Sequence, residues 1–210
     1  MSLQAVANKV CLQVKTKYIS NITDLAKRFS IEHNTTINLE DVVQIIGTVV
    51  SIPRSIVNDR WHEGFSTKEL KIGDTILFSH SIISEYYQNE HNGEPIYKNL
   101  VRYKEHEYFF ADITKIYAYR KKESWQMING YVMAMPFHEN KIFLQQEFNE
   151  AHKAKSSICL KIGSPKTNAI KISVKEGDNI YYNPNKAIKY QLNGKPFIIL
   201  QQHHILGKDA

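Results

Sequence analysis

Lys71-Ile72-Gly73-Asp74-Thr75-Ile76-Leu77-Phe78 has a pattern that the chain repeats as Lys175-Glu176-Gly177-Asp178-Asn179-Ile180-Tyr181-Tyr182. In both copies a Gly-Asp pair precedes a short, mainly apolar segment. Glycine accepts a positive φ and aspartate hydrogen-bonds nearby backbone, so each copy predicts a tight turn that leads into a half-buried strand. The repeat predicts two similar domains in one chain.

Short apolar segments flank both copies in the same order, and we expect each of them to form a strand. Around the first copy these segments are residues 10–14, 42–50, 107–110 and 112–116, and around the second they are residues 131–135, 157–163, 196–200 and 203–206. No apolar pattern with helical spacing is long enough to build a core. The sequence therefore predicts an all-β fold of two tandem barrels, residues 1–122 and 123–210, the first with longer loops and one short helix.

Composition fits a chain that buries two cores, since 42% of its 210 residues are hydrophobic. No apolar run is long enough to span a bilayer, and the first five residues lack the pattern of a secretory signal, so a cytoplasmic location is expected. Cys11 and Cys159 each lie inside a predicted strand, one in each half. They are interpreted as small core residues, not as a disulfide or a metal pair.

The net charge of +6 comes mainly from the second half: residues 1–124 hold 16 basic and 15 acidic residues, and residues 125–210 hold 11 and 6. The lysines of the second half are scattered, which is typical of a solvated surface. The 12 tyrosines form no local cluster with Arg or Lys, so binding of nucleic acid is the weakest interpretation.

Catalytic motifs find little support in this sequence. His203 and His204 are adjacent, and neighbours on a strand point to opposite faces, so the pair is not expected to chelate one ion. His62-Glu63 lacks the second histidine of a zinc protease motif, and the chain has no glycine-rich phosphate loop, dinucleotide fingerprint or nucleophile elbow. We expect no enzyme activity, no catalytic residue, no metal and no cofactor.

The second half resembles a GroES-type co-chaperonin, the small β-barrel that caps a chaperonin ring, over about residues 126–209. The resemblance lies in the order and spacing of residues 131–135, 158–163, 197–200 and 204–206, and in Val174-Lys175-Glu176-Gly177-Asp178-Asn179-Ile180, which is similar to the family's hallmark Val-x-x-Gly-Asp segment. It implies a GroEL-type chaperonin in its ATP-bound state as partner. It also implies a ring-shaped homo-oligomer, without membrane association.

Between its first two strands the family carries a flexible loop whose apolar tripeptide docks on the chaperonin, and Ile142, Phe143 and Leu144 stand there in this chain. By physical chemistry alone, an apolar triplet in so polar a stretch can be disordered when free and become ordered on binding. The alternative is a short strand that packs on its own barrel, with Phe148 on the same face.

The first half resembles the family less closely, and its first loop is longer. Ile22, Leu25 and Phe29 have the spacing of a short amphipathic helix. They form either a second docking element or a helix that packs on the barrel, and this spacing favours packing. Residues 81–95 predict an added hairpin with an Asn-Gly turn. By resemblance, roof loops lie near residues 54–61 and 164–168, and no chemistry is assigned to them.

Two functions from different classes follow from these patterns. The first is a tandem co-chaperonin that closes a chaperonin chamber. The alternative is a structural or ring-assembly protein, for example a phage virion component, built from paired GroES-like barrels. If both barrels enter one ring, the number of barrels in that ring is even. If one barrel forms the ring and the other decorates it, a heptamer is possible.

Overall fold

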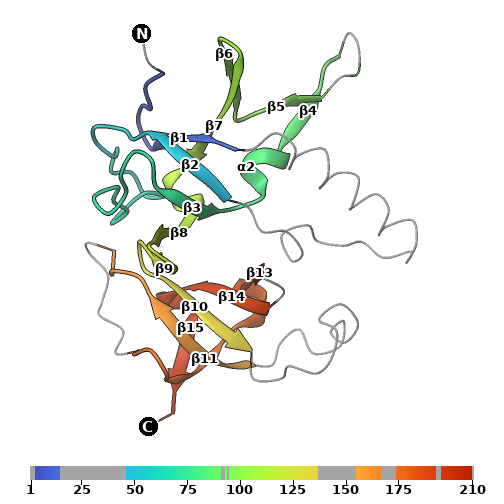
Figure 1. Ribbon diagram of the computed structural model, residues 1–210. Coiled ribbons are helices and arrows are strands. Elements are labelled where there is room, and N and C mark those ends of the chain that lie inside the picture. Colours follow the sequence, from blue (N-terminus) through green and yellow to red (C-terminus); the bar gives the residue numbers. More distant parts are fainter. Residues whose placement is uncertain are drawn as a thin grey trace.

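The computed structural model describes residues 3–14, 46–90, 93, 95–136, 155–166, 174–192 and 195–209. Two antiparallel sheets lie one above the other, and the N and C ends of the chain lie at opposite ends of the molecule (Figure 1). One sheet has seven strands and the other has six, while a separate two-stranded sheet projects from the first (Figure 1). The all-β prediction is confirmed.

The two large sheets share one strand order. The seven-stranded sheet runs β6 (Leu100–Tyr103), β7 (His106–Asp112), β1 (Lys9–Gln13), β2 (Ile46–Ser51), β3 (Thr75–Phe78), β8 (Ile116–Lys121) and β9 (Ser124–Met127). The six-stranded sheet runs β13 (Ile188–Leu192), β14 (Lys195–Gln201), β10 (Tyr131–Pro136), β11 (Lys155–Ile162), β12 (Asn179–Tyr182) and β15 (Ile205–Lys208). In this order β6, β7, β1, β2, β3 and β8 of the first sheet correspond to β13, β14, β10, β11, β12 and β15 of the second. Among the described strands of these sheets, β9 has no counterpart.

Irregularities in the ladders recur at corresponding places. The register shifts between Cys11 and Leu12 and between Leu77 and Phe78 in the first sheet, and between Met133 and Ala134 and between Tyr181 and Tyr182 in the second. A 3-10 helix connects β7 to β8 in the first sheet, η2 (Ile113–Lys115), and another connects β14 to β15 in the second, η4 (Gln202–His204). The two sheets are thus alike in detail as well as in order.

The Gly-Asp segments form the predicted turns. Gly73 has a φ of 93°, the Asp74 N–H donates to the Lys71 carbonyl at 3.1 Å, and the Asp74 carboxylate accepts from the Lys71 N–H at 2.7 Å. This is the hydrogen bond of a turn whose third residue needs a positive φ, which explains the glycine. Gly177, Asp178 and Lys175 repeat the arrangement with a φ of 92° and distances of 3.1 and 2.7 Å.

Each turn is fixed to the preceding strand. In the first sheet the Gly73 N–H donates to the Val49 carbonyl at 2.8 Å, and the Val49 N–H donates to the Asp74 carbonyl at 2.9 Å. Gly177, Asp178 and Cys159 make the same two bonds at 2.8 and 2.9 Å. The turn therefore sets the register of the strand that follows it.

Each sheet encloses a core of its own. The first core is centred on Val10, Leu12, Val49, Ile76, Phe78, Phe109, Ile113 and Ile116, and the second on Val132, Ala134, Cys159, Ile180, Tyr182, Ile198 and Leu200. Cys11 and Cys159 are fully buried, as predicted, and burial raises the pKa of each thiol to about 11. Both thiols therefore stay protonated near neutral pH.

The insertion after β3 differs in part from the prediction. Its first residues form a short helix, α2 (Ser81–Ser84), not a strand. Ile82 and Ile83 are adjacent and both are buried in the first core, which a strand with alternating faces would not allow. The predicted hairpin follows the helix as β4 (Tyr86–Gln88) and β5 (Pro95–Tyr97).

We predict that Gly177→Ala lowers the free energy of unfolding by about 1–2 kcal/mol, because an L-residue is strained at this positive φ. Space is not the cause, since a Cβ at Gly177 would meet no atom within 4 Å. Gly207→Ala is the control, because a Cβ there also meets nothing within 4 Å and its φ is not positive. Urea unfolding followed by circular dichroism measures both; equal effects of the two substitutions would contradict the assignment.

Candidate functional site

The predicted docking segments join corresponding strands. Residues 15–45 connect β1 to β2, and residues 137–154 connect β10 to β11. The candidate docking residues, Ile142, Phe143, Leu144, Ile22, Leu25 and Phe29, lie outside the described residues. The structure does fix the points of attachment: Pro136 pairs with Ser157 across β10 and β11, and Gln13 pairs with Thr48 across β1 and β2. The described residues on either side of each segment are thus held together by neighbouring strands.

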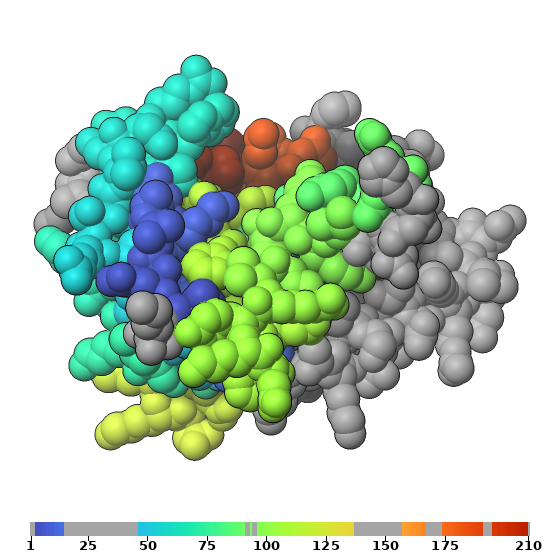
Figure 2. All heavy atoms as spheres, turned by 90° about the horizontal axis from the view of Figure 1, so that it is seen from above, coloured from blue at the N-terminus to red at the C-terminus, as the bar shows by residue number. Residues whose placement is uncertain are grey.

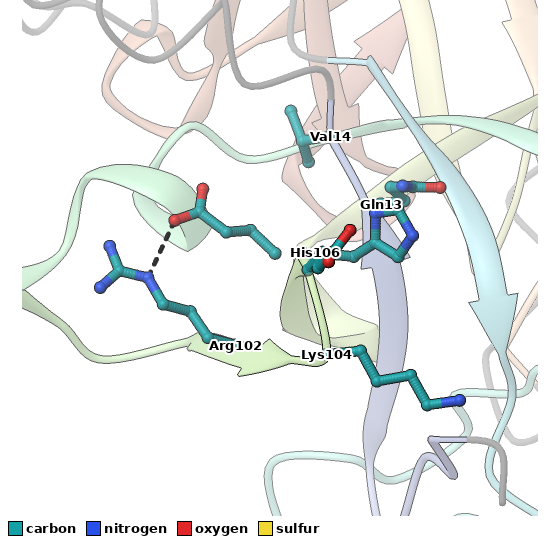
Figure 3. Close-up of a pocket in the computed structure, with 7 residues that line it drawn as sticks. Gln13, Val14, Arg102, Lys104 and His106 are labelled. Carbon is teal, nitrogen blue, oxygen red and sulfur yellow. Dashed lines mark hydrogen bonds and ion pairs between the residues drawn. The ribbon is translucent and has the colours of Figure 1, made fainter.

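A cavity of about 410 Å³ lies beside the point where residues 15–45 leave the first sheet (Figure 3). Gln13 and Val14 line it from β1, and the turn between β6 and β7 lines it with charged side chains (Figure 3). Arg102 Nε donates to Glu107 Oε1 at 3.0 Å, so this cation is already neutralised by an acid of the same cavity. Among the described residues that line the cavity, none has a hydroxyl or thiol that could act as a nucleophile.

His62 fastens the loop between β2 and β3 to the corner between β7 and β8. Its Nδ1 lies 2.8 Å from Asp59 Oδ1 and its Nε2 lies 3.1 Å from Asp112 Oδ1. Asp112 also caps η2 by accepting from the Thr114 N–H at 3.0 Å. Burial lowers the pKa of His62, but the hydrogen bonds to Asp112 and Asp59 outweigh it and raise the pKa above its ordinary value. When it is protonated, the imidazole forms charge-assisted hydrogen bonds to two carboxylates and holds this loop against the first sheet.

A third apolar cluster joins the two sheets. It contains Leu77, Tyr117, Ala118 and Met127 from the first sheet and Tyr131, Met133, Tyr190 and Ile199 from the second. On β3, Ile76 and Phe78 face the first core while Leu77 lies in this contact. The strand is therefore buried on both sides, which explains its unbroken apolar sequence.

Two tyrosine hydroxyls fix the contact. The Tyr190 hydroxyl donates to the Phe78 carbonyl at 2.6 Å, and the Tyr131 hydroxyl donates to the Thr114 carbonyl at 2.5 Å. The Tyr117 ring meets both tyrosine rings edge to face, at centroid distances of 5.0 Å to Tyr131 and 6.1 Å to Tyr190. Burial raises the pKa of Tyr131 to about 12, so its hydroxyl keeps the proton that it donates.

Polar residues of the predicted roof loop near residues 164–168 contact the segment between β2 and β3 beside this cluster. The Lys166 ammonium lies 4.1 Å from the centre of the Phe65 ring, and the Ser164 hydroxyl donates to Glu69 Oε1. Gly163 is required by close approach, because a Cβ there would lie 2.8 Å from the Ile128 nitrogen. Sequence reasoning missed this contact, although the continuous apolar runs of β3 and β10 were a signal for it.

His203 and His204 differ from the prediction. They lie on η4 and not on a strand, and their ring centres are only 4.1 Å apart. Burial, followed by the positive charge of neighbouring groups, lowers the pKa of His204 to about 4. Within the described residues no group of three metal-ligating side chains is found, so the pair has no third ligand there.

Part of the chain matches a known protein family. Residues 138–208 match the sequence model of the chaperonin 10 Kd subunit family, Cpn10, to which GroES-type co-chaperonins belong. The matched range begins in the segment between β10 and β11 and ends in β15. No curated protein matches the chain. In the described parts of the chain, no helix is long and apolar enough to cross a membrane.

We predict that Tyr190→Phe lowers the free energy of unfolding by about 1–3 kcal/mol, because it removes the donor to a buried carbonyl. Tyr181→Phe is the matched control, since its hydroxyl bonds Asp209 on the surface, and a change within about 0.5 kcal/mol is expected. Urea unfolding measures both variants. A neutral Tyr190→Phe would show that the hydroxyl does not fix the contact.

We predict that the hydrogen bonds from His62 to Asp59 and Asp112 stabilise the fold less as the pH rises through the raised pKa of His62. The folded pKa lies above the unfolded one, so the contribution is complete below the unfolded value of about 6.5 and disappears above the folded value. The difference in unfolding free energy between wild type and His62→Gln, measured from pH 6 to 9, should shrink in this window. If the difference in unfolding free energy between the two proteins is constant with pH, His62 does not stabilise the fold through its positive charge.

Proposed function

We propose that this protein is a tandem co-chaperonin, which caps a GroEL-type chaperonin ring in its ATP-bound state and assists protein folding in the cytoplasm. The observation that carries the proposal is the Cpn10 match over residues 138–208, on a sheet whose strand order is repeated by the rest of the chain. The match supports a co-chaperonin type of function at the level of the family. Capping, the tandem duplication and the docking residues are the parts that we add.

The repeated architecture supports a duplication with domains at residues 1–122 and 123–210. Strand order, register shifts and the hydrogen bonds of the Gly-Asp turns all recur. Coincidence is a poor explanation for so many shared details, since antiparallel sheets of this size have many possible orders. In this division β9 is the first strand of the second domain and pairs with β8, the last strand of the first domain.

Docking is assigned to Ile142, Phe143 and Leu144. The pairing of Pro136 with Ser157 holds both ends of their segment at one end of the β10–β11 strand pair. An apolar triplet on such a tether gains buried area in a groove of the partner and loses conformational entropy, which keeps the affinity moderate. Moderate affinity suits a lid that must leave in every cycle.

The protein itself contributes no chemistry in this mechanism. ATP hydrolysis belongs to the chaperonin, and the lid acts by excluding solvent and confining the client. Ile22, Leu25 and Phe29 of the first domain occupy the corresponding segment and form the second docking candidate. The spacing of these three residues favours packing on their own barrel, so we assign them the weaker role.

We predict that replacing Ile142, Phe143 and Leu144 together by Ser abolishes ATP-dependent binding to the chaperonin of the host. The triple replacement of Ile22, Leu25 and Phe29 by Ser is the matched control, and it should retain most of the binding. Surface plasmon resonance with immobilised chaperonin, with and without ATP, provides the measurement, and circular dichroism checks that both variants fold.

The possible results separate the two functions. If only the second triple substitution abolishes binding, docking lies on the first domain. If wild type fails to bind the chaperonin in either nucleotide state, the co-chaperonin proposal is wrong, and a structural ring-assembly protein becomes the better description.

A further inference from the structure

The first barrel carries an insertion that the second barrel lacks. Residues 79–99 connect β3 to β6, whereas residues 183–187 connect the corresponding strands β12 and β13. The insertion contains α2 and the β4–β5 hairpin, and it lies outside the residues that match the Cpn10 family. Figure 2 shows residues in the green of this region at the surface of the molecule. A role for the hairpin would therefore be additional to what the family match implies.

The base of the insertion is fixed to the first barrel. Ile82 and Ile83 of α2 are buried in its core. The side-chain amide of Asn99, which follows the hairpin, donates to the Ile82 carbonyl at 3.1 Å. The Asn99 carbonyl in turn accepts from the Phe110 N–H of β7 at 2.9 Å. The hairpin thus projects from a fixed support, as Figure 1 shows, and a partner would meet a surface that is already formed.

Both faces of the hairpin expose aromatic or aliphatic side chains. Tyr86 lies opposite Tyr97 on one face, with ring centres 6.0 Å apart, and Tyr87 lies opposite Ile96 on the other. Tyr86, Tyr87 and Ile96 are 54%, 53% and 37% exposed. None of these four residues belongs to a buried apolar cluster of the described structure. A two-stranded hairpin alone is marginally stable in water, so apolar groups exposed on both faces indicate a surface that a partner covers.

The outer edge of β4 has free backbone groups. The Lys98 N–H donates to the Glu85 carbonyl at 3.0 Å, which makes these two residues a hydrogen-bonded pair of the antiparallel ladder. Because hydrogen-bonded and non-hydrogen-bonded pairs alternate, the N–H and C=O groups of Tyr86 and Gln88 point away from β5. Within the described residues no strand pairs with this edge. The outer edge of β5 includes Pro95, which has no N–H, so the edge of β4 is the better one for a further strand.

The hairpin is acidic, although the chain as a whole is basic. Residues 85–99 contain three glutamates and one lysine, whereas the net charge of the chain is +6. Glu85 precedes β4 and Glu90 follows it, and both are exposed. A segment that pairs with β4 would have its two ends near these carboxylates. Basic residues at the ends of the segment would therefore complement the charge of the hairpin.

We propose that the β4–β5 hairpin binds extended segments of non-native client chains, which add to the edge of β4 as a third strand. The segments that fit this surface have apolar residues in the middle and basic residues at the ends. Their backbone pairs with Tyr86 and Gln88, and their side chains cover Tyr86 on one face of the hairpin and Tyr87 on the other. A non-native chain offers such unpaired extended backbone along its length, whereas a folded partner offers it only at an edge strand.

This inference goes beyond the proposed function, because it gives the protein a contact with client chains that does not depend on the chaperonin. It is tested on the free, full chain with a fluorescein-labelled peptide of sequence Lys-Val-Thr-Phe-Thr-Val-Lys. Fluorescence anisotropy should show saturable binding. The same peptide with alternate amides N-methylated, which removes the donors to β4, should not bind. A peptide with Glu in place of both Lys should bind at least severalfold more weakly.

Variants of the hairpin test the same contact from the side of the protein. Gln88→Pro removes one outward N–H at a position where an edge strand accommodates proline, and it should weaken binding about threefold to tenfold. Gln88→Thr is the matched control, because it changes the side chain and keeps the N–H, and it should bind like wild type. The double variant Glu85→Lys, Glu90→Lys should reverse the preference between the Lys-ended and the Glu-ended peptide. Circular dichroism checks that each variant folds.

A competition experiment distinguishes non-native chains from folded partners. Reduced and carbamidomethylated lysozyme, a basic chain that stays unfolded, should displace the labelled peptide from wild type. Native lysozyme should not displace it. Equal displacement by the two forms would contradict binding of non-native chains.

The inference is also wrong if wild type does not bind the peptide, if N-methylation has no effect, or if Gln88→Pro and Gln88→Thr bind alike. If wild type binds no peptide but Gln88→Pro loses binding to the chaperonin, the hairpin is a chaperonin contact instead. A wild type that binds the peptide and no chaperonin would overturn the proposed function alone, so the two failures are distinguishable.

Discussion

Burial of single strands on both faces is the constraint on which the rest of this structure depends. In β3, β10 and β14, alternate residues enter the core of their own sheet, and the residues between them enter the contact with the other sheet. A strand of this kind cannot shift by one residue without exchanging the two sets, so both sheets and their mutual orientation are specified together. The hydroxyls of Tyr131 and Tyr190 donate to backbone carbonyls in this contact, so both buried hydroxyls have a hydrogen-bond partner.

Sequence reasoning predicted what depends on local chemistry. The Gly-Asp turns, the strands around them and the buried cysteines follow from backbone conformation and alternation, and the structure has them. It did not predict α2, because Ile82 and Ile83 are both buried by tertiary packing, nor the helical turn at His203 and His204. The contact between the sheets was missed for a related reason. An apolar run such as residues 75–78 indicates burial, but it does not say which element covers the second face.

The proposed lid needs a rigid body and a docking segment attached to it. The two barrels are held together by an apolar cluster and two tyrosine hydroxyls, and His62 fixes a loop within the first barrel. The docking triplet is assigned to a segment attached to the second barrel at Pro136 and Ser157. A pair of barrels linked in this way would behave as one building block, and a ring of such blocks would present pairs of unlike domains to the chaperonin. In such a ring the second barrel, which carries the Cpn10 match, would dock on the chaperonin, and the divergent first barrel would act as a spacer.

The most direct test of the account is electron microscopy of the protein mixed with the chaperonin of its host and ATP. If the protein is a lid, a dome of barrels is expected over the chaperonin ring, with density reaching the chaperonin from the segment between β10 and β11. Chaperonin particles without a cap, beside separate rings or filaments of this protein, would contradict a lid and identify an assembly protein instead.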